Sequence, residues 1–375
     1  MERYFGESTP KLGFGLMRLP KLADGKIDVE QVKQMVDLFL DAGMTYFDTA
    51  YVYDGGESEK ASKLALVDRH PRESYTLATK LNAWMGPKNE AEAKQQFFTS
   101  LERTGAGYFD YYLLHALQRS NYTIYDEYHI WDFAKEQKAK GLIRHYGFSF
   151  HADPELLEEL LNDHPDVDFV QLQINYSDWE HPGTASRECW EIAHRHGKSI
   201  VIMEPVKGGA LADPVPGVQK ILKEADPNAS FASWAIRFAA SLDGIITVLS
   251  GMSNRAQMQD NLSYMKDFKP LTEAEQAVIR RAQIALNEDT SIPCTACHYC
   301  TDGCPMNIPI PEIFTVSNRQ RGNEAFRGRR EYTIATTGRG KASACVECGQ
   351  CENACPQQLK IITHLKDCAA LFEQA

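Results

Sequence analysis

Hydrophobic positions in the first three quarters of the chain follow two alternating patterns. Short apolar runs, rich in β-branched and aromatic residues, recur at intervals, and LGFGLMRLP (12–20) can supply the first of them. The others are YFDTA (46–50), YTLATK (75–80), YFDYYLLHAL (108–117), IRHYGFSF (143–150), FVQLQIN (169–175), SIVIMEPV (199–206) and GIITVLSG (244–251). Runs of this length and composition predict buried strands.

The segments between these runs have helical spacing. In residues 29–43 the apolar side chains Val32, Met35, Val36 and Phe39 recur at i, i+3, i+4 and i+7. The segments 90–105, 153–165 and 185–197 behave in the same way. Strand–helix units repeated over a span of this length predict a parallel (β/α)8 barrel, an α/β fold. An open doubly wound sheet is the alternative, and it is disfavoured because no G-x-G-x-x-G follows the first strand.

The chain changes character after the predicted helix at 271–289. Only one of the ten cysteines precedes residue 293. We therefore predict two domains: the TIM barrel over residues 1–286 and a small, mostly helical, ferredoxin-like domain over residues 287–375.

Charge and hydropathy exclude several classes of protein. The net charge of the 375-residue chain is −11, which disfavours a nucleic-acid partner or an anionic membrane surface. No apolar run approaches the roughly 18 to 20 residues that a membrane helix needs. The start of the chain lacks the basic and apolar regions of a secretory signal. We therefore expect a soluble cytoplasmic protein, in which clustered cysteines indicate metal binding rather than disulfides.

The cysteines form two copies of one motif, C-x2-C-x2-C-x3-C-P. In two-cluster ferredoxins the first three cysteines of such a motif hold one 4Fe–4S cluster and the fourth reaches the other cluster. The spacing therefore assigns one cluster to Cys294, Cys297, Cys300 and Cys355, and the second to Cys345, Cys348, Cys351 and Cys304. Structural zinc is the alternative, but zinc sites use two separated pairs of cysteines and have no use for the third cysteine of each motif.

Polar residues follow neighbouring strands of the predicted barrel, where barrel enzymes place their chemistry. These residues are Asp48 and Tyr53 after the second strand, Lys80 at the end of the third and His115 in the fourth. Each has an ordinary structural interpretation when taken singly. Together they suit carbonyl reduction: Lys80 lowers the pKa of Tyr53, which donates a proton, while Asp48 anchors Lys80 and His115 orients the carbonyl.

FDTAYVYDGGESE, LATK and DYYLLHAL resemble the signature segments of the aldo-keto reductases, and the resemblance runs through residues 10–286. The tail resembles that of an iron–sulfur branch of this family. The resemblance implies NADP or NAD bound across the barrel mouth. It assigns Gly15, Met17, Asp48 and Met203 to the nicotinamide end, Ser149 and Gln171 to the carboxamide, Val206, Lys207 and Gly208 to the pyrophosphate, and Gly251, Gln257 and Asn261 to the adenosine end.

Two functions are compatible with these patterns. The first is an NAD(P)H-dependent oxidoreductase acting on a carbonyl or alcohol, in which the two clusters relay electrons to a ferredoxin- or flavodoxin-like carrier. Hydride transfer moves two electrons and each cluster moves one, so a direct single-electron route and structural or sensing clusters stay open as well. The second function is a catalytically idle cofactor sensor whose tail is an interaction or electron-carrier module.

Overall fold

Eight parallel strands form a closed barrel in the order β1 to β8, each paired with its neighbours in sequence and β8 with β1. The computed structural model describes residues 3–286, 291–321 and 325–373. The strands are β1 Leu12–Gly15, β2 Tyr46–Asp48, β3 Thr76–Leu81, β4 Phe109–Leu117, β5 Ile143–Phe150, β6 Phe169–Gln173, β7 Ser199–Met203 and β8 Ile245–Ser250. The predicted (β/α)8 barrel is confirmed.

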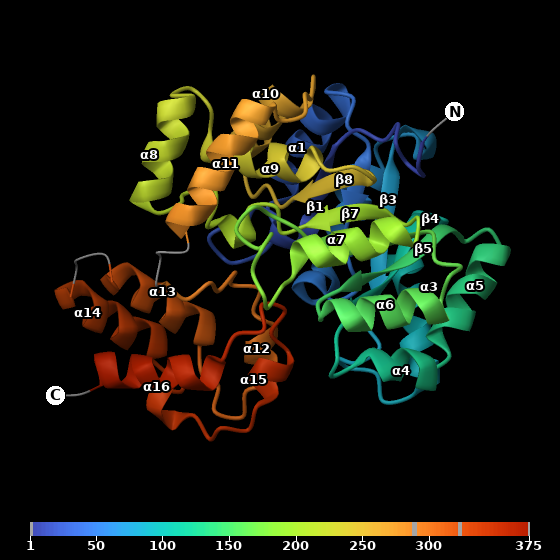
Figure 1. The fold of residues 1–375 in the computed structure, drawn as a ribbon. Helices are drawn as coiled ribbons and strands as arrows, with labels where there is room; N and C mark the ends of the chain where they lie inside the picture. Colours follow the sequence, from blue (N-terminus) through green and yellow to red (C-terminus); the bar gives the residue numbers. More distant parts are fainter. Residues whose placement is uncertain (1–2, 287–290, 322–324, 374–375) are drawn as a thin grey trace.

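Helices surround the barrel and continue into the tail (Figure 1). Those of the barrel are α1 Val29–Asp41, α2 Glu57–Ser62, α3 Glu90–Thr104, α4 Tyr122–Glu127, α5 Ile130–Ala139, α6 Pro154–Asp163, α7 Ser186–Arg195, α8 Pro216–Ala225, α9 Phe231–Ala240, α10 Arg255–Met265 and α11 Glu273–Leu286. Those of the tail are α12 Tyr299–Asp302, α13 Ile310–Arg321, α14 Ala325–Thr336, α15 Gln350–Asn353 and α16 Ile361–Phe372.

Helix α1 shows how the sequence specifies these elements. The side chain of Asp28 accepts a hydrogen bond from the Gln31 backbone N–H and caps the first turn. The apolar stripe of the helix, which includes Met35 and Phe39, is buried against the barrel. The helix ends at Asp41, and Gly43 follows with a φ of 82°, a conformation that favours glycine. The predicted helical spacing is therefore confirmed here.

Two hydrophobic layers stabilise the barrel. The larger lies between the strands and the surrounding helices, and a smaller one fills the interior of the barrel around Tyr46, Tyr111 and Phe169. Phe5 packs against this inner layer at the end of the barrel where the strands begin, with its ring 6.0 Å from that of Tyr111 and 4.3 Å from that of His145. At the opposite end, where the strands finish, the barrel has a cavity.

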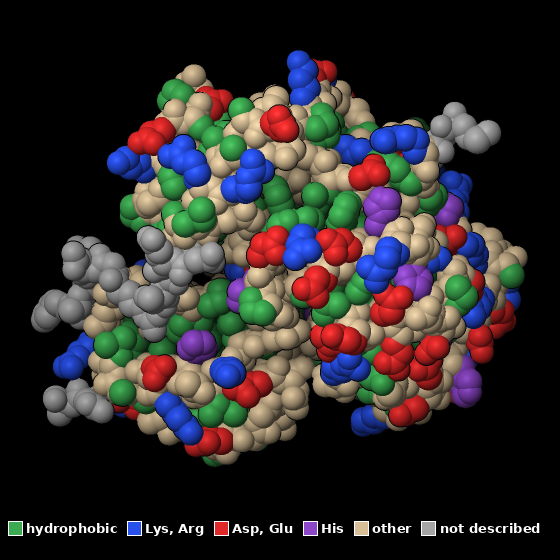
Figure 2. All heavy atoms as spheres, in the orientation of Figure 1, with side chains coloured by type: hydrophobic (Ala, Val, Ile, Leu, Met, Phe, Trp, Pro, Cys, Tyr) green, Lys and Arg blue, Asp and Glu red, His purple; other side chains and the backbone are tan. Residues whose placement is uncertain are grey.

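The tail forms a lobe beside the barrel (Figures 1 and 2). It has its own hydrophobic core of residues from α13, α14 and α16. The boundary predicted between residues 286 and 287 adjoins segment 287–290, which lies outside the described residues. Side chains of both charges are scattered over the face in Figure 2. In the part of the chain that the structure describes, no helix is long and apolar enough to cross a lipid bilayer.

Candidate active site

The four predicted catalytic residues meet at the end of the barrel where the strands finish. Asp48 ends β2, Lys80 and His115 lie near the ends of β3 and β4, and Tyr53 begins the short turn after β2. The Lys80 ammonium donates hydrogen bonds to the Asp48 carboxylate and, at 2.8 Å, to the Thr49 carbonyl. Its Nζ lies 3.3 Å from the Tyr53 hydroxyl. The His115 and Tyr53 rings are in edge-to-face contact, with centroids 5.7 Å apart.

Lys80 and Asp48 form a buried ion pair. Burial lowers the pKa of Lys80 and raises the pKa of Asp48, and each shift is opposed by the charge of the other residue. Removal of either partner leaves a buried charge without compensation, which is strongly unfavourable. The pair therefore fixes an ammonium group beside Tyr53.

Tyr53 differs from the expectation in one respect. Burial raises the pKa of Tyr53 well above its usual value, and the carboxylates of Asp48 and Glu204 raise it further. Arg18 opposes this rise. We expected a lowered pKa; the structure instead places a phenol that keeps its proton at neutral pH beside a cation that can stabilise the phenolate left after proton transfer.

His115 is held as a neutral imidazole. Burial, together with the positive charge of Lys80, lowers the pKa of His115 well below its usual value. The backbone carbonyl of His115 accepts hydrogen bonds from the side chains of Tyr125 and Trp84, which orient the end of β4. A neutral imidazole has one N–H group, so His115 can donate a hydrogen bond to a substrate oxygen without carrying charge.

A cavity of about 320 Å³ opens over these residues. It is lined by most of the predicted cofactor positions: Gly15, Met17, Asp48, Ser149, Gln171, Met203, Val206, Gly208, Gly251, Gln257 and Asn261. Lys207 does not line the cavity. Its ammonium is buried in an ion pair with Asp178, so it is not directed at a bound phosphate.

The two residues predicted to hold the carboxamide, Gln171 and Ser149, fit a nicotinamide. Gln171 Oε1 is buried without a hydrogen-bond partner, which is unfavourable unless a ligand supplies a donor. Ser149 is the register partner of Gln171 between β5 and β6, and its Oγ accepts a hydrogen bond from the Ala116 backbone N–H at 2.7 Å. The pyrophosphate end fits less simply, because the Gly208 N–H already donates to the Glu204 carboxylate at 2.6 Å.

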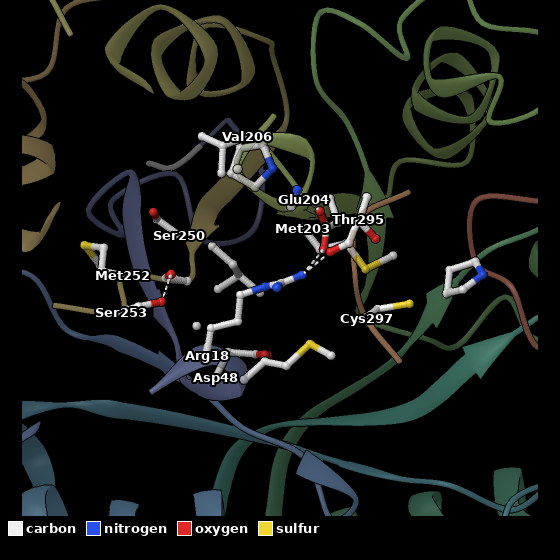
Figure 3. Close-up of a pocket in the computed structure, with 18 of the residues that line it drawn as sticks. Arg18, Asp48, Met203, Glu204, Val206, Ser250, Met252, Ser253, Thr295 and Cys297 are labelled. Atoms are coloured by element: carbon white, nitrogen blue, oxygen red, sulfur yellow. Dashed lines mark hydrogen bonds and ion pairs between the residues drawn. The ribbon is translucent and has the colours of Figure 1, made fainter. Parts of the chain in front are cut away.

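Several residues of this cavity were missed by the sequence analysis. Arg18 and Glu204 line the wall of the cavity with their charged groups 4.0 Å apart (Figure 3). Tyr299 and Gln357 reach the cavity from the tail. Arg18 follows the first strand directly, which is a signal that sequence alone could have used. Nothing in the sequence indicates which tail residues contact the barrel.

The cysteines of the tail surround two small hollows. One is lined by Cys294, Cys297, Cys300 and Cys355, and the other by Cys304, Cys345, Cys348 and Cys351. These are the two sets that the spacing predicts, with the fourth cysteine of each motif in the hollow of the other. Their role as cluster ligands stays a prediction.

The donor sets fit iron–sulfur clusters better than single ions. Among the described residues, no three Cys, His, Asp or Glu side chains converge closely enough to hold one metal ion. A zinc site needs four ligands within about 2.3 Å of a single point. A cube of four irons is larger than one ion, so its thiolates stand farther apart around a hollow.

Comparison with known proteins agrees with this geometry. The Aldo/keto reductase family matches residues 11–284, and a 4Fe-4S dicluster domain matches residues 293–359. The uncharacterized oxidoreductase YqkF of Bacillus subtilis is 23% identical over 303 residues, which are 69% of this chain and 94% of that protein. An aldo-keto reductase of Mycolicibacterium smegmatis is 29% identical over 56% of this chain and 69% of its own length.

Solved structures share the barrel. The holo form of aldo-keto reductase AKR11C1 from Bacillus halodurans has a TM-score of 0.61 and 28% identity, covering 75% of this chain and 95% of that one. A Klebsiella pneumoniae aldo/keto reductase in complex with NADP and acetate has a TM-score of 0.60 and 21% identity, covering 74% of this chain and 93% of that one. With its barrel and its cysteine-bearing tail both matched, the chain belongs to the aldo/keto reductase family, in the branch that carries a C-terminal 4Fe-4S dicluster domain.

Proposed function

We propose that this protein is an NAD(P)H-dependent oxidoreductase that interconverts a carbonyl and an alcohol, with Tyr53 as the proton donor. One observation carries the proposal: the Tyr53 hydroxyl lies 3.3 Å from the buried Lys80 ammonium, beside a neutral His115, in a cavity lined by the predicted cofactor positions. An acid, a stabilising cation and a neutral hydrogen-bond donor are the groups that carbonyl reduction requires.

NADP or NAD is the proposed cofactor, bound along the cavity. A bound nicotinamide supplies the hydride for the carbonyl carbon. Gln171 and Ser149 would hold its carboxamide, and Gln257 and Asn261 would face the adenosine end. The Klebsiella pneumoniae reductase with NADP is only 21% identical, so that likeness supports the fold, whereas the unpaired Gln171 Oε1 supports the cofactor.

The residues of the chain then have separate roles. His115 hydrogen-bonds the carbonyl oxygen and orients it towards Tyr53. Tyr53 transfers its proton to that oxygen as negative charge develops there. Lys80 stabilises the resulting phenolate, and Asp48 holds Lys80 in position through their ion pair.

We further propose that the two cysteine sets hold 4Fe–4S clusters that relay electrons to a ferredoxin- or flavodoxin-like carrier when an alcohol is oxidised, with two single-electron transfers to the carrier for each electron pair that the alcohol loses. Such clusters supply or accept single electrons. The positions of two cysteines support a relay: Cys297 lines the active-site cavity, whereas Cys348, in the other set, is exposed at the surface. One set would thus receive electrons at the site, and the other would pass them to the carrier at the surface.

Substitution of Tyr53 tests the proposal. We expect Tyr53→Phe to lower NADPH-dependent reduction of 4-nitrobenzaldehyde by about 10²- to 10⁴-fold, because the proton donor is lost. The measurement is NADPH absorbance at 340 nm with the iron-loaded protein.

Tyr75→Phe is the matched control, since its hydroxyl is buried without a partner just before β3, at the opposite end of the strand from the site. Equal activity of Tyr53→Phe and the wild type would contradict the role of Tyr53. Cofactor binding by the wild type, without turnover of any carbonyl or alcohol, would support the sensor instead.

A further inference from the structure

Tyr299 connects the cysteine-rich tail to the catalytic residues. It lies between Cys297 and Cys300, at the first position of α12, yet its side chain lines the barrel cavity together with Tyr53 and His115. Its hydroxyl is 3.5 Å from His115 Nε2, and the two rings meet nearly perpendicularly with centroids 6.4 Å apart. A residue of the cluster-binding motif therefore stands at the reacting end of the cavity.

The cysteine loop is held in this place by the barrel. The Arg18 guanidinium crosses the cavity and donates a hydrogen bond of 2.6 Å to the Thr295 carbonyl (Figure 3). Gly208 approaches the same residue so closely that a Cβ at Gly208 would lie 2.6 Å from the Thr295 carbonyl oxygen. The position of the loop is thus specified by close backbone contacts.

A second contact fixes the other motif. The side-chain amides of Gln357 and Gln173 exchange two hydrogen bonds of 2.9 Å, and both residues are buried. Gln357 follows Cys355 and Pro356, the end of the second cysteine motif, and lines the cavity as well. Tail residues at both motifs therefore line the cavity together with residues of the barrel.

The number of donors around His115 indicates what Tyr299 binds. A carbonyl oxygen has two lone pairs, and the proposed reaction uses both, for Tyr53 and for His115. The Tyr299 hydroxyl lies 3.5 Å from His115 Nε2. In the tautomer with hydrogen on Nε2, which lets His115 donate, Tyr299 accepts from His115, and its own O–H is a third donor. It is therefore placed to bond an oxygen on the carbon next to the carbonyl.

We propose that Tyr299 is a substrate-binding residue, supplied by the cluster-binding loop, that selects carbonyl compounds with an oxygen substituent on the adjacent carbon. This inference rests on the proposed function and deepens it. It means that the tail shapes the substrate end of the site as well as holding clusters, so that cluster loading and substrate binding act on the same loop.

A pair of ketones of matched shape tests the inference. The two ketones differ in one group on the carbon adjacent to the carbonyl: hydroxyacetone carries a hydroxyl there, and 2-butanone carries a methyl. We expect Tyr299→Phe to lower the ratio of their kcat/KM values, hydroxyacetone over 2-butanone, by about 3- to 10-fold, since one hydrogen bond is lost. Most of the change should be in KM for hydroxyacetone, with kcat nearly unchanged.

Tyr332→Phe is the control within the same domain. The Tyr332 hydroxyl accepts a hydrogen bond of 2.8 Å from the Ala342 N–H in the tail core and does not line the cavity. The Tyr332→Phe variant should keep the wild-type ratio of kcat/KM values for the two ketones. Iron content is measured in each variant, so that loss of clusters is distinguished from loss of the phenol.

A second measurement does not depend on turnover. Visible circular dichroism of the oxidised iron–sulfur protein is recorded while NADP⁺ and then hydroxyacetone are added. We expect hydroxyacetone to change the spectra of the wild type and of Tyr332→Phe by similar amplitudes. At the same concentration, the amplitude of the change in Tyr299→Phe should be at most one third of the wild-type amplitude.

The two failures are distinguishable. If the wild type turns over no carbonyl or alcohol, the proposed function is wrong, and the dichroism titration still decides whether Tyr299 binds the ligand. The inference about Tyr299 is overturned if Tyr299→Phe retains the wild-type ketone ratio, or the wild-type spectral response where there is no turnover. An equal loss in Tyr332→Phe overturns it as well.

Discussion

At the scale of single residues, the protonation of Tyr53 would determine whether it serves the proposed reaction as an acid or as a base. Burial raises its pKa, so the phenol is protonated throughout the neutral range. Reduction of a carbonyl needs that proton, whereas oxidation of an alcohol needs the phenolate as a base. His115 adds no charge near neutral pH, because its pKa is lowered by burial and by Lys80.

These directions predict an asymmetric pH profile. Below the raised pKa of Tyr53 the phenol is the main form, so we expect kcat/KM for reduction to be nearly constant between pH 6 and 9. The phenolate fraction rises tenfold per pH unit below that pKa, so alcohol oxidation should rise through the same range. Initial rates in both directions, in buffers of constant ionic strength, measure this. An oxidation rate that levels off near pH 7 would contradict a raised pKa.

At the scale of elements, hydrophobic periodicity was enough to predict the barrel. The run 143–150 coincides with β5, and every other run contains or overlaps its strand. The run 199–206 extends beyond β7, which ends at Met203. There Glu204 takes a φ of 56°, a left-handed conformation that breaks the strand and turns its carboxyl group into the cavity. Apolar patterns do not report such a turn.

The positions of site residues were predictable where they depend on strand ends, and less so where they depend on contacts between residues distant in sequence. Asp48, Tyr53, Lys80 and His115 follow from the parallel barrel, which brings the strand ends together. Lys207 was assigned to a phosphate, but a partner distant in sequence, Asp178, holds its charge. The positions of Tyr299 and Gln357 depend on how the tail packs against the barrel, which no local pattern encodes.

Helix α10 carries a prediction about the cofactor. Its first turn is capped by Asn254, which accepts a hydrogen bond from the Gln257 N–H, and the Gln257 side chain accepts one from the Ser253 N–H. Gln257 is therefore bound to backbone, and Arg255 is the exposed cation of this turn, 3.1 Å from the Gln34 side chain. A helix N-terminus with a nearby arginine suits a phosphate group.

We therefore expect Arg255→Ala to raise KM for NADPH by about tenfold and to change KM for NADH less than twofold, because only NADPH carries the additional phosphate. Lys266→Ala, just past the other end of the same helix, is the matched control. Steady-state kinetics with each cofactor, at saturating carbonyl, give both values. Equal changes in KM for NADPH and for NADH would show that Arg255 does not bind the additional phosphate of NADPH.

At the scale of the whole molecule, the two cysteine sets have different surroundings. The set with Cys297 shares its loop with Thr295 and Tyr299, which line the active-site cavity. The set with Cys348 lies away from the cavity, and Cys348 is exposed. Removal of one ligand from each set should therefore have different consequences for the barrel, although the two motifs are alike in sequence.

We expect Cys297→Ala and Cys348→Ala each to lower iron from about eight to about four atoms per chain. Ketone reduction should fall at least tenfold further in Cys297→Ala, because the loop that carries Tyr299 loses its anchor, while Cys348→Ala leaves that loop in place. Iron analysis and kcat/KM with hydroxyacetone measure both effects, with Cys189→Ala, outside both motifs, as the control. If the two variants lose the same activity, the tail acts on the barrel only through its overall folding, and the loop has no special part in the site.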